Sequence, residues 1–306
     1  MVKSTFTKRI FRLVDKIFYK SQNPPKKTAE ALSSLNVTRD LSPSEEFSDC
    51  KMDLLIKPRA SGEKIPVIFY IHGGGFSAGD KRFRDYYCAR IANATNCAIL
   101  NVNHPLGPEN PGPIPLKCLV KMANWLEDNA EAFGLDLSKT IVMGDSSGAY
   151  YAAMLAAIQG SDELQKIYGE MRHTFTAGLF NCAIFDLVRS IKHPVPLGFT
   201  RGVCKDITNL KPKEALTWEY MPFACPVDHV SPAFPKSLLI YSKLDFFAWG
   251  QAEEFIEKLE KNGVPYEEYH STHFLDNHAF SINLNNKVAR AARKKMIDFI
   301  TGIFGE

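Results

Sequence analysis

Short apolar runs alternate with amphipathic segments through most of the chain from about residue 51. Five runs rich in valine, isoleucine, leucine and aromatic residues are almost free of polar positions: residues 66–72, 96–102, 140–145, 177–185 and 237–245. Runs of this length and character are typical of strands that are buried on both faces of a parallel sheet. The pattern therefore predicts a mostly parallel central sheet.

The segments between these runs carry apolar residues at helical spacing. They predict helices over residues 86–93, 115–129, 148–159, 251–262 and 286–304. Strands that alternate with helices of this length indicate an α/β fold, in which helices cover both faces of the sheet.

Two parts of the chain depart from this alternation. In the first, Phe6, Ile10, Leu13 and Ile17 follow at spacings of four, three and four among Lys and Arg, which predicts an amphipathic helix over residues 3–20. A second helix is expected over residues 28–35. The second part, residues 187–232, has scattered prolines and weak periodicity. We expect residues 1–45 and 187–232 to form a cap over the carboxyl edge of the sheet, with residues 46–186 and 233–306 as the catalytic domain.

Composition narrows the function classes. The 306 residues are 45% hydrophobic and 23% charged with a net charge of +3, as expected for one globular domain with insertions. No basic cluster is interleaved with aromatic residues, so nucleic acid is not expected as a partner. The seven cysteines are scattered without a C-x-x-C pair, which predicts free thiols and no metal site. Neither a secretory signal nor a membrane span is evident, so a cytoplasmic protein is expected.

The pattern G-x-S-x-G, which marks a nucleophilic serine, occurs twice. It surrounds Ser77 in GFSAG and Ser146 in GDSSG. A nucleophile elbow requires a strand, a sharp turn and a helix in succession. TIVMGD leads into Ser146 and SGAYYAAMLAAI follows it, whereas no helical pattern starts directly after Ser77. We therefore predict Ser146 as the nucleophile and the glycine-rich loop HGGGFSAG, residues 72–79, as a source of backbone N–H donors for an oxyanion.

A serine nucleophile needs a base, and the base needs a carboxylate that orients it. Asp245 ends the last apolar run, which places it at the same sheet edge as Ser146. Three histidines follow it and are candidates for the base: His270, His273 and His278. The residues alone leave the choice among these histidines open.

Five motifs occur in a fixed order: HGGGF (72–76), PLGPENPGPIP (105–115), GDSSGA (144–149), VSPAFPKSLLIY (230–241) and NHAF (277–280). In this order they resemble the hormone-sensitive lipase family of α/β-hydrolases, over residues 50–303. The resemblance implies an α/β-hydrolase fold and a serine carboxylesterase without metal or cofactor. It also implies a catalytic triad of Ser146, Asp245 and His278, with Asp186 outside the triad and His273 as the competing base.

Further roles follow from the same resemblance. The backbone N–H groups of Gly74, Gly75 and Ser147 are expected to form the oxyanion hole, and His72, His104 and Glu109 to have structural roles. The substrate is expected to be a neutral ester with a short acyl chain. Candidate pocket residues are aromatic: Phe76, Tyr150, Phe246, Phe247 and Trp249.

The sequence departs from the family pattern in places that affect substrate preference. Ser147 and Ala149 stand where the family usually has Ala and Gly, and the acid motif reads KLDFFAWG. Three alternatives to a short-chain esterase stay open: a small-molecule deacetylase, a lipid ester hydrolase docked on a membrane through residues 3–20, and a hydrolase-fold receptor without turnover. A homodimer and a membrane surface also stay open as partners.

Overall fold

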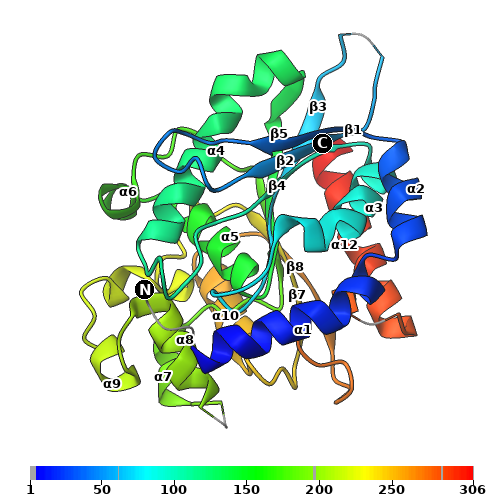
Figure 1. Cartoon of the computed structure of the whole chain (residues 1–306). Helices are drawn as coiled ribbons and strands as arrows, with labels where there is room; N and C mark the ends of the chain where they lie inside the picture. Colours follow the sequence, from blue (N-terminus) through cyan, green and yellow to red (C-terminus); the bar gives the residue numbers. More distant parts are fainter. Residues whose placement is uncertain (1–4, 61, 196–197, 284, 306) are drawn as a thin grey trace.

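The computed structural model describes residues 5–60, 62–195, 198–283 and 285–305 (Figure 1). In these ranges eight strands form one sheet in the order β1-β2-β4-β3-β5-β6-β7-β8. The first two pairings, β1 with β2 and β2 with β4, are antiparallel, and all the others are parallel. The strands are β1 (Asn36–Leu41), β2 (Met52–Ile56), β3 (Ile65–Ile71), β4 (Ala98–Val102), β5 (Leu135–Asp145), β6 (Ala177–Asn181), β7 (Lys236–Ser242) and β8 (Tyr266–Ser271).

Helices cover both faces of the sheet, so the predicted α/β fold is confirmed. One face packs on α2 (Pro25–Ser33), α3 (Asp85–Thr95) and α12 (Lys287–Gly305). The other face packs on α4 (Ile114–Phe133), α5 (Ser147–Ile158), α6 (Asp162–Tyr168) and α10 (Gln251–Lys261). All five predicted strands are present, with ends shifted by a few residues. The helix predicted at residues 28–35 and the five helices predicted between and after the strands are also present, with similar shifts.

Three strands were not predicted, and two of them form the edges of the sheet. The edge strands β1 and β8 carry polar residues on both faces because neither is buried on both sides, so they lack the apolar run of a central strand. The third, β2, is buried, but Asp53 interrupts its apolar run. Polar edge strands of this kind also disfavour pairing with another chain.

The N-terminal helix, α1 (Phe6–Gln22), exposes its apolar side, whereas most surface helices bury theirs. Its N-cap Thr5 accepts a hydrogen bond from the Lys8 N–H at 3.1 Å. The side chains of Phe6, Leu13 and Ile17 are 56–61% exposed, whereas Thr7 and Lys8 are buried. Residues 3 and 4 of the predicted helix lie outside the described residues. The apolar side of α1 therefore faces away from the protein.

Short helices dominate residues 187–232, as the weak periodicity indicates. They are α7 (Leu187–Lys192), α8 (Phe199–Thr208), α9 (Pro212–Ala215), η2 (Met221–Phe223) and η3 (Pro226–Asp228). Figure 1 shows α1 beside α8, and the Phe11 and Phe199 rings of these helices lie 6.0 Å apart. The cap and its limits stay a prediction, and residues 1–4, 61, 196, 197, 284 and 306 of the predicted segments lie outside the described residues.

Two expectations from composition can be compared with the structure. All seven cysteines are free, and all except the half-buried Cys50 are buried. No described helix combines the length and the apolar character needed to cross a membrane.

Candidate active site

Ser146 lies in a sharp turn between β5 and α5. Its backbone has φ 54° and ψ −123°, which is an unfavourable conformation for a residue with a side chain. The turn needs glycine on both sides: a Cβ at Gly144 would lie 2.4 Å from the Gly148 carbonyl carbon, and one at Gly148 would lie 2.2 Å from the Ile71 oxygen. The strand and the helix thus approach closely and present the Ser146 hydroxyl at the carboxyl edge of the sheet.

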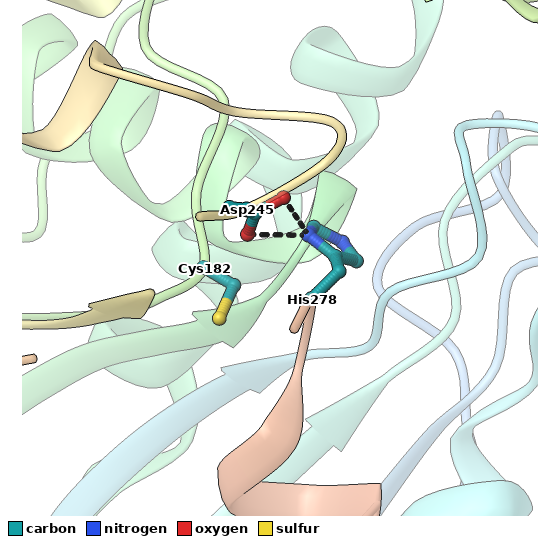
Figure 2. Close-up of side chains that lie close together, drawn as sticks. All are labelled: Cys182, Asp245 and His278. Carbon is teal, nitrogen blue, oxygen red and sulfur yellow. Dashed lines mark hydrogen bonds and ion pairs between the residues drawn. The ribbon is translucent and has the colours of Figure 1, made fainter. Parts of the chain in front are cut away.

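Three predicted residues, Ser146, Asp245 and His278, form a hydrogen-bonded chain. The His278 Nε2 atom lies 2.8 Å from the Ser146 hydroxyl. The His278 Nδ1 atom lies 2.8 Å from Asp245 Oδ2 and 3.0 Å from Oδ1 (Figure 2). Asp245 also accepts from the N–H groups of Phe247 and Ala248 at 2.8 and 3.1 Å. These bonds leave the His278 Nε2 lone pair available toward the serine when Nδ1 carries the proton.

The acid and the base shift each other's proton affinity. Burial raises the pKa of Asp245, but the adjacent His278 and the backbone donors outweigh burial and hold that pKa below its usual value. Burial lowers the pKa of His278, and the charge and hydrogen bond of Asp245 outweigh it, so that the pKa of His278 is raised. The pair is therefore arranged to stabilise an imidazolium that forms during a reaction.

Cys182 is a third potential metal ligand beside Asp245 and His278, with all three ligand atoms within 4.8 Å of one another (Figure 2). Its Sγ accepts the Ala279 N–H at 3.2 Å, and burial raises the pKa of this thiol well above its usual value. A metal would require a thiolate and would compete with the hydrogen bonds that Asp245 already makes. The group therefore fits an acid–base pair with a structural thiol better than a metal centre.

The glycine-rich loop, residues 72–79, runs beside the nucleophile. A Cβ at Gly73 would lie 3.1 Å from the Ser146 Cβ. Within the described ranges no acceptor is bonded to the backbone N–H of Gly74, Gly75 or Ser147. Backbone N–H groups without an acceptor are the kind of donor that a developing oxyanion requires.

Other residues of the loop have structural contacts. The buried Ser77 hydroxyl donates to the Gly75 carbonyl at 3.3 Å, and the His72 ring stacks on the His104 ring with centroids 4.8 Å apart. Burial lowers the pKa of His72, and it lowers that of His104 to about 3, so both rings are neutral near pH 7. Glu109 in the following turn pairs with Lys8 of α1.

The alternative acid and bases lie apart from Ser146. Asp186 caps α7, where its carboxylate accepts the Arg189 N–H at 2.8 Å. The His273 ring stacks on the exposed Phe274 with centroids 5.3 Å apart, and its Nδ1 accepts the Leu275 N–H. His270, on β8, lies beside Tyr241 of the neighbouring strand β7.

Sequence reasoning missed a buried ion pair directly beneath the nucleophile. Arg84 donates to Asp145 Oδ2 at 2.7 Å and to Oδ1 at 3.1 Å, and the Tyr70 hydroxyl donates to Oδ1 at 2.5 Å. Burial raises the pKa of Asp145, but Arg84 and Tyr70 outweigh burial and keep that pKa below its usual value. Asp145 is visible in GDSSG, whereas nothing in KRFRD marks Arg84 as its partner.

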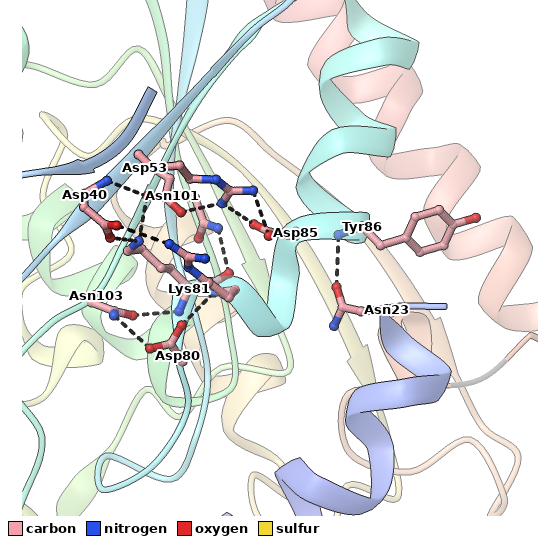
Figure 3. A network of polar contacts seen from close by, with 11 residues as sticks. Asn23, Asp40, Asp53, Asp80, Lys81, Asp85, Tyr86, Asn101 and Asn103 are labelled. Carbon is pink, nitrogen blue, oxygen red and sulfur yellow. Dashed lines mark hydrogen bonds and ion pairs between the residues drawn. The ribbon is translucent and has the colours of Figure 1, made fainter. Parts of the chain in front are cut away.

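A second charged network fixes the chain where it leaves the glycine-rich loop (Figure 3). The fully buried Asp53 accepts from Lys81 Nζ at 2.6 Å and from Arg39 Nη1 at 2.5 Å. Arg39 also forms two hydrogen bonds with Asp85, at 2.8 and 2.9 Å, and the Lys81 N–H donates to Asn103 at 2.6 Å. Lys81 begins the turn η1 (Lys81–Arg84), so the network holds both the end of the loop and the position of Arg84.

The α1 helix covers the loop through Phe11. A Cβ at Gly75 would lie 2.1 Å from the Phe11 ring, so the ring rests directly on this glycine. The Phe11 centroid is 6.3 Å from that of Phe247, which is 5.0 Å from that of His278. Phe11 therefore forms part of the roof over the serine and the histidine.

The predicted pocket residues occupy different environments. Phe247 lines an apolar cavity of about 50 Å³, and Phe246, Phe247 and Trp249 line a wider groove of about 620 Å³. Tyr150 lines a cavity of about 20 Å³ and donates its hydroxyl to the Ala224 carbonyl at 2.9 Å. Phe76 is a buried core residue.

Comparisons with known proteins agree with the fold. A family described as having the alpha/beta hydrolase fold matches residues 68–277, which is more than half of the chain. The chain belongs to the alpha/beta hydrolase family. The family and the fold inferred from the ordered motifs are thus confirmed.

Relatives of this alpha/beta hydrolase match over part of their length. It is 34% identical over 93 residues to esterase LipI of Mycobacterium tuberculosis, which covers 30% of this chain and 29% of that protein. It is 34% identical over 131 residues to 3-O-acetylpapaveroxine carboxylesterase CXE1 of Papaver somniferum, covering 38% and 41%. The matched segments span about a third of the length of such relatives.

A solved structure extends the likeness in fold to nearly the whole chain. An esterase of Pyrobaculum calidifontis superposes with a TM-score of 0.74 at 21% identity and covers 96% of this chain and 93% of its own. At this identity the superposition shows the shared fold alone.

Proposed function

We propose that this alpha/beta hydrolase is a serine carboxylesterase that hydrolyses esters with short acyl chains. The observation that carries the proposal is the pair of 2.8 Å contacts that link Ser146 to His278 and His278 to Asp245. The names of matched relatives, among them an esterase and a carboxylesterase, support the same reaction class.

In the proposed reaction, Ser146 Oγ attacks the ester carbonyl carbon while His278 Nε2 takes its proton. Asp245 holds Nδ1 protonated and stabilises the imidazolium, and the N–H groups of Gly74, Gly75 and Ser147 donate to the oxyanion. His278 then gives the proton to the departing alcohol, which leaves an acyl group on Ser146. Water, activated by His278, hydrolyses this acyl-enzyme. Every step uses groups of the chain and water, so no metal or cofactor takes part.

The cavity next to Phe247 supports a short acyl chain. Its volume is only about 50 Å³, its lining is apolar, and Phe247 in that lining also contacts the His278 ring. Two relatives are named for acetyl groups: the Papaver carboxylesterase and a versiconal hemiacetal acetate esterase of Dothistroma septosporum. Acetylated small molecules therefore lie within the proposed substrate class, and a deacetylase would use the same site.

A receptor without turnover would not need a serine, a histidine and an aspartate in hydrogen-bonding order, so the enzyme is favoured over the receptor. The seven free cysteines support a reducing compartment such as the cytoplasm.

A series of p-nitrophenyl esters from acetate to palmitate tests the proposal, measured with the wild type and four variants. Ser146→Ala and His278→Ala should lose nearly all activity, whereas Ser77→Ala and His273→Ala should keep it. The wild type should prefer acetate and butyrate. Full activity in Ser146→Ala would overturn the proposed nucleophile, and a preference for palmitate would overturn the acyl range.

A further inference from the structure

The α1 helix presents three distinct stripes along its length. Residues at helical spacing share a face, so each stripe can be assigned from the sequence and its burial. The apolar stripe is Phe6, Ile10, Leu13 and Ile17; the basic stripe is Arg9, Arg12, Lys16 and Lys20; and the inner face is Thr7, Lys8, Phe11, Asp15 and Gln22. All of the basic stripe and all of the apolar stripe except the half-buried Ile10 are exposed.

Polar contacts hold the inner face on the body of the protein. Thr7 donates to Asp206 of α8 at 2.6 Å, Lys8 donates to the Gly107 carbonyl at 2.9 Å, and Asp15 accepts the Gly79 N–H at 3.0 Å. These bonds join α1 to α8, to the turn at Gly107 and to the glycine-rich loop. The outward direction of the apolar stripe is therefore fixed by specific bonds.

Exposed apolar side chains are concentrated at this end of the molecule. Of the thirteen large hydrophobic residues that are exposed within the described ranges, all except Ile114 and Leu216 lie on α1 or in the loops after β7 and β8. Those on the loops are Leu244, Phe246, Trp249, Phe274 and Leu275. Both loops follow parallel strands and so lie at the carboxyl edge, where Phe247 contacts Phe11 of α1. We call these five loop residues the apolar rim; it lies at the carboxyl edge of the sheet, as the candidate active site does.

We propose that α1 and this apolar rim dock the protein on a lipid surface that carries anionic headgroups. A helix with an exposed apolar stripe and basic residues beside it lies in the plane of a bilayer interface, with its apolar side among the acyl chains. The basic stripe contributes four positive charges, and none of them forms a salt bridge with another residue in the described part of the chain. Each such charge attracts anionic headgroups.

Charge favours a membrane over a second copy of the chain as the occupant. A symmetric contact between two apolar stripes would bring two basic stripes together, and like charges in contact oppose association. The one acidic residue of α1, Asp15, points inward to Gly79 and cannot neutralise them. On a lipid surface with anionic headgroups, the apolar stripe contacts acyl chains while the basic stripe contacts the headgroups.

Docking would place the mouth of the candidate site at the lipid interface. Combined with the proposed esterase activity, on which this step rests, it directs the site to esters that partition into membranes, with the short acyl group entering the cavity. Docking itself does not depend on that activity, so the two can be tested separately.

Flotation with phosphatidylcholine vesicles, with and without phosphatidylserine, tests the docking of the full chain. The wild type should float with vesicles that contain phosphatidylserine. Leu13→Ser/Ile17→Ser should reduce binding more than about tenfold, because two exposed apolar side chains are lost. Ile114→Ser/Leu216→Ser removes the two exposed apolar residues elsewhere and should bind as the wild type does.

A second matched pair separates charge from hydrophobicity. Lys16→Gln/Lys20→Gln should weaken binding to phosphatidylserine vesicles about thirtyfold, since each basic residue contributes about a fivefold effect. Lys117→Gln/Lys121→Gln, with the same spacing on α4, should leave binding unchanged. Circular dichroism shows whether each variant is folded.

The outcomes distinguish the two proposals. A wild type that stays unbound, or apolar variants that bind equally well, would overturn docking. A dimer in analytical ultracentrifugation that Leu13→Ser/Ile17→Ser dissociates, without vesicle binding, would assign the stripe to a second copy and also overturn it. A protein that floats as expected but hydrolyses no p-nitrophenyl acetate would refute the esterase alone.

Discussion

Replacing Arg84 by leucine should strongly destabilise the fold beneath the nucleophile. Asp145 is 2% exposed, and Arg84 supplies two of its three side-chain hydrogen bonds and its counter-charge. Breaking a buried ion pair by removing one partner typically costs about 3–5 kcal/mol, because the other charge stays buried. Tyr70 still donates to Asp145, so we expect a loss of about 3 kcal/mol near pH 7. That is a large part of the about 5–15 kcal/mol that stabilises a typical domain.

The pH dependence gives this prediction a sign. Arg84 and Tyr70 lower the pKa of Asp145 in the folded state, so the stability that this group contributes is present above its unfolded pKa of about 3.9 and is lost as pH falls through the lower folded pKa. Without Arg84, burial dominates and the pKa rises. The deficit of Arg84→Leu should therefore shrink as pH falls from 7 toward 5, because a proton neutralises the stranded carboxylate.

Urea unfolding of four proteins measures the effect: the wild type, Arg84→Leu, Asp145→Asn and the double variant. Because Asp145→Asn removes the stranded charge, the double variant should be more stable than Arg84→Leu. A loss below about 1 kcal/mol in Arg84→Leu would refute the reasoning. So would a double variant that is no more stable than Arg84→Leu, since the penalty would then not come from an unpaired carboxylate.

Four further outcomes are expected from the geometry. The acid limb of the pH profile of kcat/KM should have its midpoint above 6.5, because the pKa of His278 is raised. Asp245→Asn should lower this midpoint and should lower the rate by about 10⁴-fold. A midpoint that does not move in this variant would contradict the coupling between Asp245 and His278. Burial raises the pKa of Asp15 to about 6, so the contribution of this group to stability falls as pH rises from 4 to 6. In Asp15→Asn the slope of Tm against pH should therefore flatten. The free energy of unfolding of this variant should be higher than that of the wild type by about 1 kcal/mol at pH 7.5, after allowance for solvent screening. Phe11→Ala should raise kcat/KM for bulky esters several-fold and leave acetate hydrolysis unchanged, and equal effects on both would show that Phe11 does not restrict access. Gly148→Ala should cost more than about 2 kcal/mol in urea unfolding, because its Cβ would lie 2.2 Å from a backbone oxygen.

The central part of the fold could be predicted from the sequence because burial on both faces leaves a simple pattern. The runs at residues 66–72 and 237–245 are apolar at nearly every position and became β3 and β7. The edge strand β8, with the sequence YEEYHS, carries no such pattern, because its stability comes from pairing with β7 rather than from its own burial.

The order of the motifs selected Ser146, Asp245 and His278, and the structure brings these three residues together. Two other features could not be predicted from the sequence. Periodicity identifies two faces of α1 and does not say which one the protein buries. Here specific bonds from Thr7, Lys8 and Asp15 outweigh the tendency to bury the apolar side. The pairing of Arg84 with Asp145 depends on the path of the chain from the glycine-rich loop, which no local pattern shows.

The polar inner face of α1 also determines the register of the helix. An apolar seam tolerates sliding, because one aliphatic contact can replace another, whereas a hydrogen bond fails within a fraction of an ångström. A slip of one residue would rotate the helix by about 100° and move it by about 1.5 Å, which would break the bonds of Thr7, Lys8 and Asp15 together. The register of α1 thus fixes the position of the Phe11 ring on Gly75. This position should stay the same whether the outer side of α1 faces water or lipid.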